Sequence, residues 1–415
     1  MRTLAKRSWV FMVLGILFSF MCFVLPAPAA EPVNIVIIAE SATLVGKAIV
    51  NGAQLAVEEI NAKGGINGQP IKLTVYDDQV KSAEAVQDFQ RAVYNDHAVA
   101  VVGSFISEVA LSLVPWSARL HTIYITTGAA SPKITQLVHD DYNANKYVFQ
   151  LKYNAIEMAQ MVCSFAQDEL VRKLGYKTAY VASENAAWTE PLDEEYLKCL
   201  PSSGLKVVGH MRFSKDTNDF TPIFATIEKE HPDVLITGWS HVGLKPTVQW
   251  HEQQIPLLIA GVDAQASTTE FWEKTNGATE GIITQAEGSP SPITPKTIPF
   301  VQAYEKMFHI SPAYAGYTTY DTIYVLKEAM EKAKSIQPDA LIKALEETRY
   351  TGVIGNIEFY DRGSPFTHGI KFGKGLGMGV LLQWQKGQLV TVWPKEAATG
   401  SLIVPSFVQK KSSSK

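Results

Sequence analysis

Two short segments of small and hydroxyl-bearing residues follow predicted strands in the first part of the chain. Residues 103–107 (GSFIS) and 127–131 (TGAAS) each come directly after a short apolar strand rich in β-branched residues. Open α/β sheets bind ligands at the carboxyl ends of their strands, and backbone N–H groups at a helix N-terminus hold anions such as carboxylates. The alternative to a ligand site is a purely structural role, in which Ser107 caps a helix and Gly128 makes a turn.

Three larger side chains stand at similar positions further along the chain. Trp188, Trp239 and Asp263 each follow a predicted strand. The strands are expected at residues 178–182, 233–237 and 256–260. A single tryptophan is usually a packing residue, but the shared position of both tryptophans after strands favours contact with a ligand.

Motifs for catalysis or cofactor binding are missing from the sequence. Residues 238–241 (GWSH) lack the glycine that a nucleophile elbow needs two residues after the serine. The glycines at 373, 375, 377 and 379 do not fit the dinucleotide-binding pattern, and no HExxH or P-loop occurs. The nine histidines show no ligand spacing. We therefore expect no metal, no cofactor and no catalytic residue, although a secreted enzyme without a recognisable motif stays an alternative.

The elements that must position these loops alternate between strand and helix. Residues 34–39 (NIVIIA) are typical of a parallel strand buried on both faces. Apolar residues recur three and four apart from Ile49 to Ile60, which indicates an amphipathic helix. Residues 71–76 then alternate between apolar and polar, as at the edge of a sheet.

The alternation starts again near residues 149–151, which implies a second parallel sheet of similar design. Three helices without intervening strands follow, and we expect them to return and cover an existing sheet. They are predicted at residues 298–308, 313–334 and 338–347. Strands punctuated by glycine begin at residue 355. The predicted fold is α/β with two Rossmann-like lobes.

Length and charge limit the class of protein. A chain of 415 residues suits two domains of ordinary size. The formal net charge is −4 and the basic residues are scattered, so the sequence shows neither a nucleic-acid-binding surface nor a polybasic membrane patch.

The first 30 residues differ from the rest of the chain. Three basic residues precede an apolar run, and residues 27–30 (APAA) offer a cleavage site, which together favour a cleaved signal peptide over a transmembrane anchor. Only Cys163 and Cys199 lie beyond this segment. They could pair in an oxidising compartment or remain two buried thiols.

Three motifs resemble the type I periplasmic solute-binding proteins of ABC transporters, in particular the leucine/isoleucine/valine-binding protein-like family. They are residues 52–68 (GAQLAVEEINAKGGING), 315–321 (AGYTTYD) and 355–363 (GNIEFYDRG). The resemblance implies two lobes of the periplasmic binding protein type I fold, joined by three crossing segments near residues 149–152, 282–286 and 356–362. The expected division is residues 31–149 plus 284–357 for lobe 1, 150–283 plus 358–405 for lobe 2, and a disordered tail from 406 to 415.

The resemblance also assigns roles to the residues at the strand ends. Ser107, Ala129 and Ser131 match the residues that hold an amino acid's α-carboxylate in the branched-chain receptors. Asp263 falls where the family has the acid that pairs with the α-ammonium, although here it is the shorter aspartate. Trp188 matches an aromatic lid residue.

Two further ligand contacts are expected from position alone. Trp239 is close to another aromatic position of the family, and Ser41 lies in the first loop, where residues 39–42 (AESA) depart from the usual Gly/Pro-rich version. Val45 also replaces an aromatic residue. These departures leave the ligand open among amino acids, amides and aromatic carboxylates.

The resemblance implies a periplasmic, monomeric receptor that delivers a small carboxylated ligand, such as a branched-chain-like amino acid, to the membrane permease of an ABC importer. The alternative is a sensor that presents its closed state to a membrane signalling partner.

Overall fold

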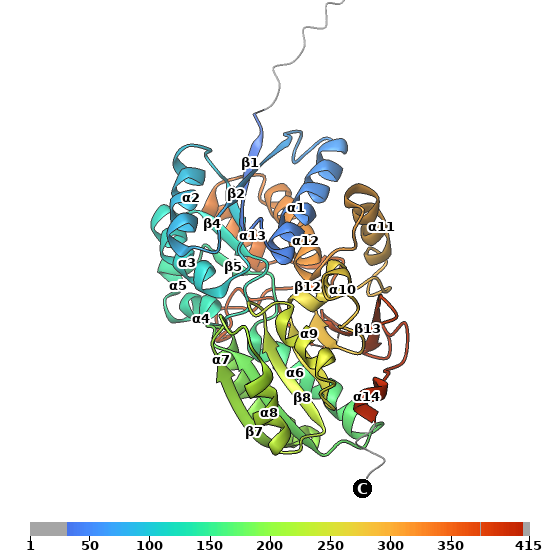
Figure 1. Ribbon diagram of the computed structural model, residues 1–415. Helices are drawn as coiled ribbons and strands as arrows, with labels where there is room; N and C mark the ends of the chain where they lie inside the picture. Colours follow the sequence, from blue (N-terminus) through green and yellow to red (C-terminus); the bar gives the residue numbers. More distant parts are fainter. Residues whose placement is uncertain (1–30, 374, 410–415) are drawn as a thin grey trace, which may run out of the picture.

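The computed structural model describes residues 31–373 and 375–409. The expected signal peptide, residues 1–30, lies outside the described residues. Two groups of elements are stacked one above the other, with the blue and orange parts of the chain in one lobe and the green and yellow parts in the other (Figure 1). Within the described residues, no helix has the length and apolar character needed to cross a membrane.

The first lobe contains a five-stranded sheet in the order β2-β1-β3-β4-β5, and every strand pairing in it is parallel. Its strands are β1 (Val33–Ala39), β2 (Ile71–Asp77), β3 (Ala100–Gly103), β4 (Ile123–Thr126) and β5 (Val148–Gln150). β1, between β2 and β3, is almost entirely buried, whereas β2 alternates in exposure at the edge, as the sequence predicts. The helices between these strands are α1 (Leu44–Ala62), α2 (Ser82–Tyr94), α3 (Ser107–Leu120), α4 (Lys133–Asp140) and α5 (Tyr142–Asn145).

Three consecutive helices return to the first lobe from far along the chain, as predicted. They are α11 (Thr297–Phe308), α12 (Tyr314–Ala333) and α13 (Pro338–Glu346). α12 packs along α1, and Gly52 meets Gly316 so closely that a Cβ on Gly52 would lie 2.4 Å from the carbonyl oxygen of Gly316. Tyr320 and Tyr324 on α12 both donate hydrogen bonds to Glu59 of α1, each at 2.7 Å. α1 is therefore covered by a segment some 260 residues later in the chain.

The second lobe has a four-stranded parallel sheet in the order β7-β6-β8-β9. Its strands are β6 (Thr178–Glu184), β7 (Lys206–Phe213), β8 (Val234–Trp239) and β9 (Leu258–Asp263). The accompanying helices are α6 (Ala155–Phe165), the π-helical turn η1 (Ala166–Val171), α7 (Thr189–Ser203), α8 (Thr221–Lys229), α9 (Lys245–Glu252), η2 (Gln265–Ser267) and α10 (Glu270–Lys274). Pro222 stands in the first turn of α8, where its missing N–H costs nothing.

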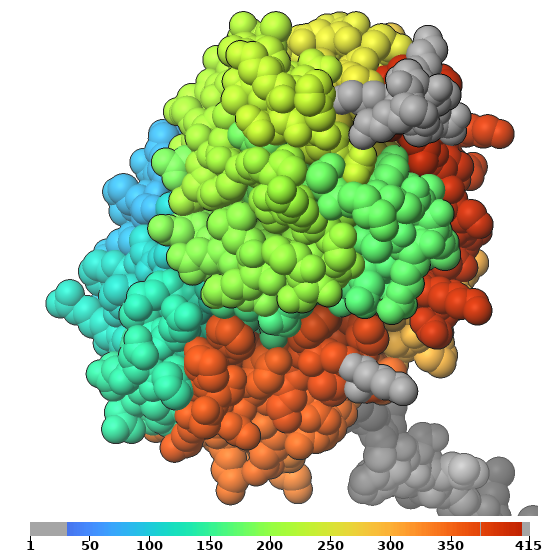
Figure 2. Space-filling view, turned by 90° about the horizontal axis from the view of Figure 1, so that it is seen from below, coloured from blue at the N-terminus to red at the C-terminus, as the bar shows by residue number. Residues whose placement is uncertain are grey.

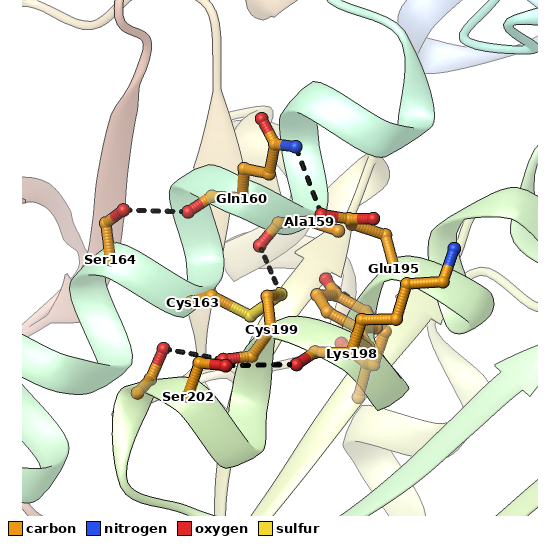
Figure 3. Close-up of a disulfide and its surroundings, with 11 residues drawn as sticks. Ala159, Gln160, Cys163, Ser164, Glu195, Lys198, Cys199 and Ser202 are labelled. Atoms are coloured by element: carbon orange, nitrogen blue, oxygen red, sulfur yellow. Dashed lines mark hydrogen bonds between the residues drawn. A yellow bond between two sulfur atoms is a disulfide. The ribbon is translucent and has the colours of Figure 1, made fainter.

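Cys163 of α6 and Cys199 of α7 form a disulfide, which the sequence left open (Figure 3). Their Cα atoms are 5.9 Å apart. Beside it, the side chain of Gln160 on α6 donates a 3.0 Å hydrogen bond to Glu195 on α7. Two adjacent helices of the second lobe are thus tied covalently.

The last part of the chain extends the second lobe with an antiparallel sheet, β10-β13-β14. Its strands are β10 (Ile283–Ala286), β13 (Val380–Gln385) and β14 (Gln388–Trp393), while β11 (Tyr350–Thr351) and β12 (Asn356–Ile357) form a small separate ladder. The expected boundary at residue 284 falls inside β10, and its pairing with β13 places residues 284–286 with the second lobe.

The end of the chain differs from the predicted disorder at residues 406–415. Residues Ser406–Gln409 form the short helix α14, in which Phe407 packs edge-on against Trp250 with ring centroids 4.9 Å apart. Apolar contact with the second lobe orders this segment. Residues 410–415 lie outside the described part of the chain.

The two lobes touch directly. Seen from below, the green part of the chain lies against the orange part without a gap in the surface (Figure 2). Three crossing segments connect the lobes: one follows β5, one follows β10, and the third lies between β12 and β13, where residues 359–370 return beside β5.

Candidate functional site

A cavity of ≈ 400 Å³ of empty volume lies between the lobes, at the carboxyl ends of both parallel sheets. Its position matches that of small-molecule sites in open α/β sheets, which lie at the carboxyl ends of the strands. The cavity is lined by Phe105, Ile106, Ser107, Gly128, Ala130, Lys152, Met158, Trp188, Ser240, His241, Val262, Ala264, Gln285 and Tyr314. Both lobes and one crossing segment therefore contribute to its walls.

The first-lobe wall is shaped by a buried glutamate. Glu40, directly after β1, accepts hydrogen bonds at its Oε1 from the backbone N–H groups of Phe105 and Ile106, at 3.3 and 3.1 Å. This holds the loop after β3 so that α3 begins at the cavity with Ser107. The hydroxyl oxygen of Ser107 accepts a 3.2 Å hydrogen bond from the N–H of Ser131, which joins the loops after β3 and β4.

Small residues leave room for a ligand on the same wall. A Cβ on Gly128 would lie 3.0 Å from the carbonyl oxygen of Ser104, so this position is closed to larger residues without movement of the backbone. In the described part of the chain, the backbone N–H groups of Ala129 and Ala130 donate to no protein acceptor. Free amides beside the N-terminus of α3 can hold a carboxylate.

The second-lobe wall is shaped by another buried glutamate. Glu184, at the end of β6, accepts hydrogen bonds at Oε2 from the backbone N–H groups of Ser240, His241 and Val242, at 2.9, 2.7 and 3.2 Å. Its Oε1 lies 2.6 Å from Nδ1 of His241. Nε2 of His241 has no partner within the described residues, and the ring lies on the cavity wall with its side chain 14% exposed.

Trp188 closes the cavity from the second lobe. It is only 5% exposed, and its neighbour Ala187 donates a 3.0 Å backbone hydrogen bond to Oε1 of Glu108 on α3. This bond runs from one lobe to the other. The structure is therefore closed around the cavity.

A buried ion pair joins two crossing segments beside the cavity. Lys152, after β5, pairs with Glu287, after β10, and both side chains are almost completely buried. The ammonium also lies 4.3 Å from the ring centroid of Tyr314. Burial lowers the pKa of Lys152, while the charge of Glu287 opposes this shift. Glu287 thus neutralises the lysine that reaches the cavity wall.

The predicted carboxylate anchors fall around one corner of this cavity. Ser107 lines it, while Ala129 and Ser131 flank Ala130, which lines it too. Trp188, predicted from the opposite lobe, also lines it. The structure brings these four predicted residues together from three segments: the start of α3, the loop after β4 and the residue before α7 (Thr189–Ser203).

The other three predicted residues do not line the cavity. Asp263 is buried, and its Oδ1 accepts hydrogen bonds from the N–H groups of Gln265 and Ala266 at the start of η2. Burial raises the pKa of Asp263 to about 7. Trp239 points into the core and donates a 3.0 Å hydrogen bond to the carbonyl of Ala182.

Ser41, the seventh predicted residue, donates its hydroxyl hydrogen bond to the carboxylate of Asp77 at the end of β2. It therefore joins the first loop to the edge strand.

Several polar residues on the wall were absent from the sequence prediction: Lys152, Ser240, His241, Gln285 and Tyr314. His241 could have been found by the same rule that selected Trp188, because it follows a buried strand. Lys152 follows the buried strand β5 in the same way, but its pairing with Glu287 has no local signal, since the two residues are 135 positions apart. Among the described residues, no group of three or more His, Cys, Asp or Glu side chains is placed to hold a metal ion.

Comparison with known proteins places these features in context. Residues 39–376 match the family model described as periplasmic binding protein. A curated relative, Leu/Ile/Val-binding protein homolog 7 of Brucella abortus (strain 2308), is 27% identical over 387 residues, covering 87% of this chain and 90% of the relative.

Solved structures share the fold. The branched-chain amino acid transporter substrate-binding protein LivJ from Streptococcus pneumoniae, in complex with isoleucine, superposes with a TM-score of 0.75 at 20% identity, covering 86% of this chain and 98% of that one. An ABC transporter solute-binding protein from R. palustris, in complex with benzoate, gives a TM-score of 0.75 at 16% identity, covering 91% and 99%.

Proposed function

Because the chain belongs to the periplasmic binding protein family, we propose that it is the solute-binding receptor of an ABC importer and binds a small carboxylated ligand between its lobes. The observation that carries this proposal is the cavity itself, to which Ser107 contributes from one lobe and Trp188 from the other. Proteins of the same fold hold isoleucine or benzoate, so a branched-chain-like amino acid and an aromatic carboxylate are both candidate ligands.

The mechanism is closure of the lobes about the crossing segments. A ligand in the cavity contacts both lobes at once, and only the shut form makes both sets of contacts, so binding shifts the population toward that form. The hydrogen bond from Ala187 to Glu108 stabilises the same state. A membrane permease can then distinguish loaded from empty receptor by shape.

We assign the protein to the periplasm, with residues 1–30 as a cleaved signal peptide and the permease subunits of the importer as its partner. The Cys163–Cys199 disulfide supports this location, because disulfides persist in oxidising compartments. The receptor acts as a monomer and leaves its ligand chemically unchanged.

A thermal-shift screen tests the proposal with amino acids, amides and aromatic acids as probes. One group should stabilise the protein strongly, by about 2.7 kcal/mol at a concentration of 100 times Kd, because the ligand binds only the folded state. Absence of stabilisation by every carboxylate would contradict the proposal. A probe recovered in altered form would instead identify an enzyme.

Replacing Ser107 and Ser131 together by alanine tests the carboxylate site. Loss of the two hydroxyls should weaken binding of the probe found in the screen by about tenfold, and the fold should persist although the N–H groups of Ser131 and Lys133 lose their acceptors. Ser112→Ala is the matched control, because its hydroxyl bonds to Val109 within the same helix. Unchanged affinity in the double variant would refute the assignment of these residues.

A further inference from the structure

The cavity wall carries no carboxylate. Among its lining residues, the polar side chains are hydroxyls, one amide, one lysine and one histidine: Ser107, Ser240, Tyr314, Gln285, Lys152 and His241. An α-ammonium group brings a full positive charge and three N–H donors. Its burial is costly unless it is paired with an acid and hydrogen-bonded.

The acids beside the wall are already engaged by the protein. Glu184 accepts hydrogen bonds from three backbone amides and contacts Nδ1 of His241. Glu287 pairs with Lys152, Glu108 accepts from Ala187, and Asp263 accepts from two amides of η2.

The second oxygens of three of these acids have no protein partner within the described residues, but they too are buried and belong to residues that do not line the cavity. They are Glu287 Oε2, Glu108 Oε2 and Asp263 Oδ2. In the described part of the chain, Glu40 Oε2 is likewise without a partner, and none of these four residues lines the cavity.

His241 offers a different contact. Its Nδ1 lies 2.6 Å from the carboxylate of Glu184, and a neighbouring carboxylate fixes the tautomer in which Nδ1 carries the proton. Nε2 then presents a lone pair, and this atom is buried on the cavity wall without a protein partner. A lone pair held in this way accepts a hydrogen bond from a hydroxyl group.

Apolar side chains form a large part of the cavity lining. Phe105, Met158, Trp188 and Val262 belong to it, together with the ring of Tyr314. The free amides and Ser107, which suit a carboxylate, belong to the first-lobe wall and His241 belongs to the second-lobe wall, while Lys152 and Gln285 are further polar residues of the lining. The lining is therefore complementary to an apolar body that carries different polar groups toward the two lobes.

Building on the proposed function, we infer that the ligand is a hydroxylated carboxylic acid without an amino group, and that His241 is the residue that selects its hydroxyl. The carboxylate lies at the loops after β3 and β4. The hydroxyl donates to Nε2 of His241. Replacement of a hydrogen atom on the ligand by an ammonium group weakens binding, because no carboxylate is among the described residues that line the cavity.

Four matched probes separate the two parts of this inference. They are phenylacetate, 4-hydroxyphenylacetate, phenylglycine and 4-hydroxyphenylglycine, with benzoate and 4-hydroxybenzoate as shorter analogues and leucine and 4-methylpentanoate as an aliphatic pair. Calorimetric Kd values should be at least tenfold lower for each acid than for its amino counterpart. They should be about tenfold lower for the best hydroxylated acid than for its unsubstituted analogue.

The variant His241→Asn keeps a side-chain N–H near Glu184 and removes Nε2. It should lower the ratio of the two Kd values, unsubstituted acid over hydroxylated acid, from about ten to about one. Ser112→Ala is the control. If both acids lose affinity equally in His241→Asn, or if the hydroxyl preference survives, His241 does not select the hydroxyl.

The outcomes also distinguish this inference from the proposed function. Tighter binding of leucine or phenylglycine than of the matching acid would overturn the inference and leave the receptor function intact. No binding by any of the eight probes would overturn both, because each carries the carboxylate that the receptor function requires.

Discussion

The two walls of the cavity are built in the same way but present different groups to the ligand. In each lobe, a buried glutamate at the end of the lobe's first strand accepts backbone N–H groups from the loop after the neighbouring strand: Glu40 for β1 and β3, Glu184 for β6 and β8. Glu184 uses its second oxygen to hold His241, whereas the second oxygen of Glu40 has no partner among the described residues.

Because of this difference, the first wall suits carboxylates in general, whereas the second wall can select among ligands. The first wall presents free backbone amides and Ser107 beside the larger side chains of Phe105 and Tyr314, and the amides can hold any carboxylate. The second wall presents Trp188 and His241, whose shape and hydrogen-bonding atoms distinguish one ligand from another. The same strand-end geometry therefore builds a common anchor on one side and a selective surface on the other.

Removal of the second-lobe glutamate should have the largest effect. Glu184→Ala leaves three buried N–H groups and His241 without their acceptor, and should lower the free energy of unfolding by about 3–5 kcal/mol. Glu40→Ala leaves only two amides unpaired and should lower it by less. Chemical denaturation at pH 7 measures both. Equal losses would mean that the two glutamates are equivalent.

The disulfide gives a second contrast between the lobes, because the Cys163–Cys199 bond ties helices of the second lobe alone. Replacing both cysteines by serine should lower the free energy of unfolding by about 2–4 kcal/mol, since the unfolded chain regains freedom. Ligand affinity should change little, because neither cysteine lines the cavity. A large loss of affinity with an intact fold would show that the α6–α7 link also positions Trp188.

A smaller effect is expected from the first wall, where two buried acids should make the free energy of unfolding depend on pH. Burial raises the pKa of Glu40, and burial together with the charge of Glu40 raises the pKa of Asp78 to about 7. The folded state therefore keeps protons that the unfolded chain releases between about pH 4 and pH 7. Stability falls as pH rises through this window, and the full penalty applies above pH 7.

Glu40→Gln removes one of these two charges and keeps an oxygen for the amides of Phe105 and Ile106. It should raise the free energy of unfolding by about 1 kcal/mol at pH 8 and by little at pH 4. Denaturation of variant and wild type at both pH values gives the difference directly. A variant that is less stable at pH 8 would show that Glu40 is stabilised as an anion.

The sequence indicated the lobes well because their strands are apolar and regularly spaced. It placed the ends of the second-lobe strands too early. β6, β8 and β9 were expected to end at residues 182, 237 and 260, and they end at Glu184, Trp239 and Asp263. Hydrophobic pattern is lost at the first polar residue or glycine, although these residues are buried and hydrogen-bonded here.

This error in length explains the position of Trp239. It was taken as a loop residue beside the ligand, but it is still part of β8, so its ring points into the core. The loop begins one residue later, which brings His241 to the cavity instead. The Lys152–Glu287 pair had no signal of any kind, because the two residues meet only when separate crossings come together.

The contact of Gly52 with Gly316 has a consequence for biosynthesis. α1 is made early and its partner α12 is made late, so the apolar face of α1 stays uncovered while more than half of the chain is synthesised. The four strands of the second lobe's parallel sheet, by contrast, are contiguous from residue 178 to 263. The middle of the chain can therefore fold before its beginning does. Any product cut short before residue 314 lacks the helix that covers this face of α1.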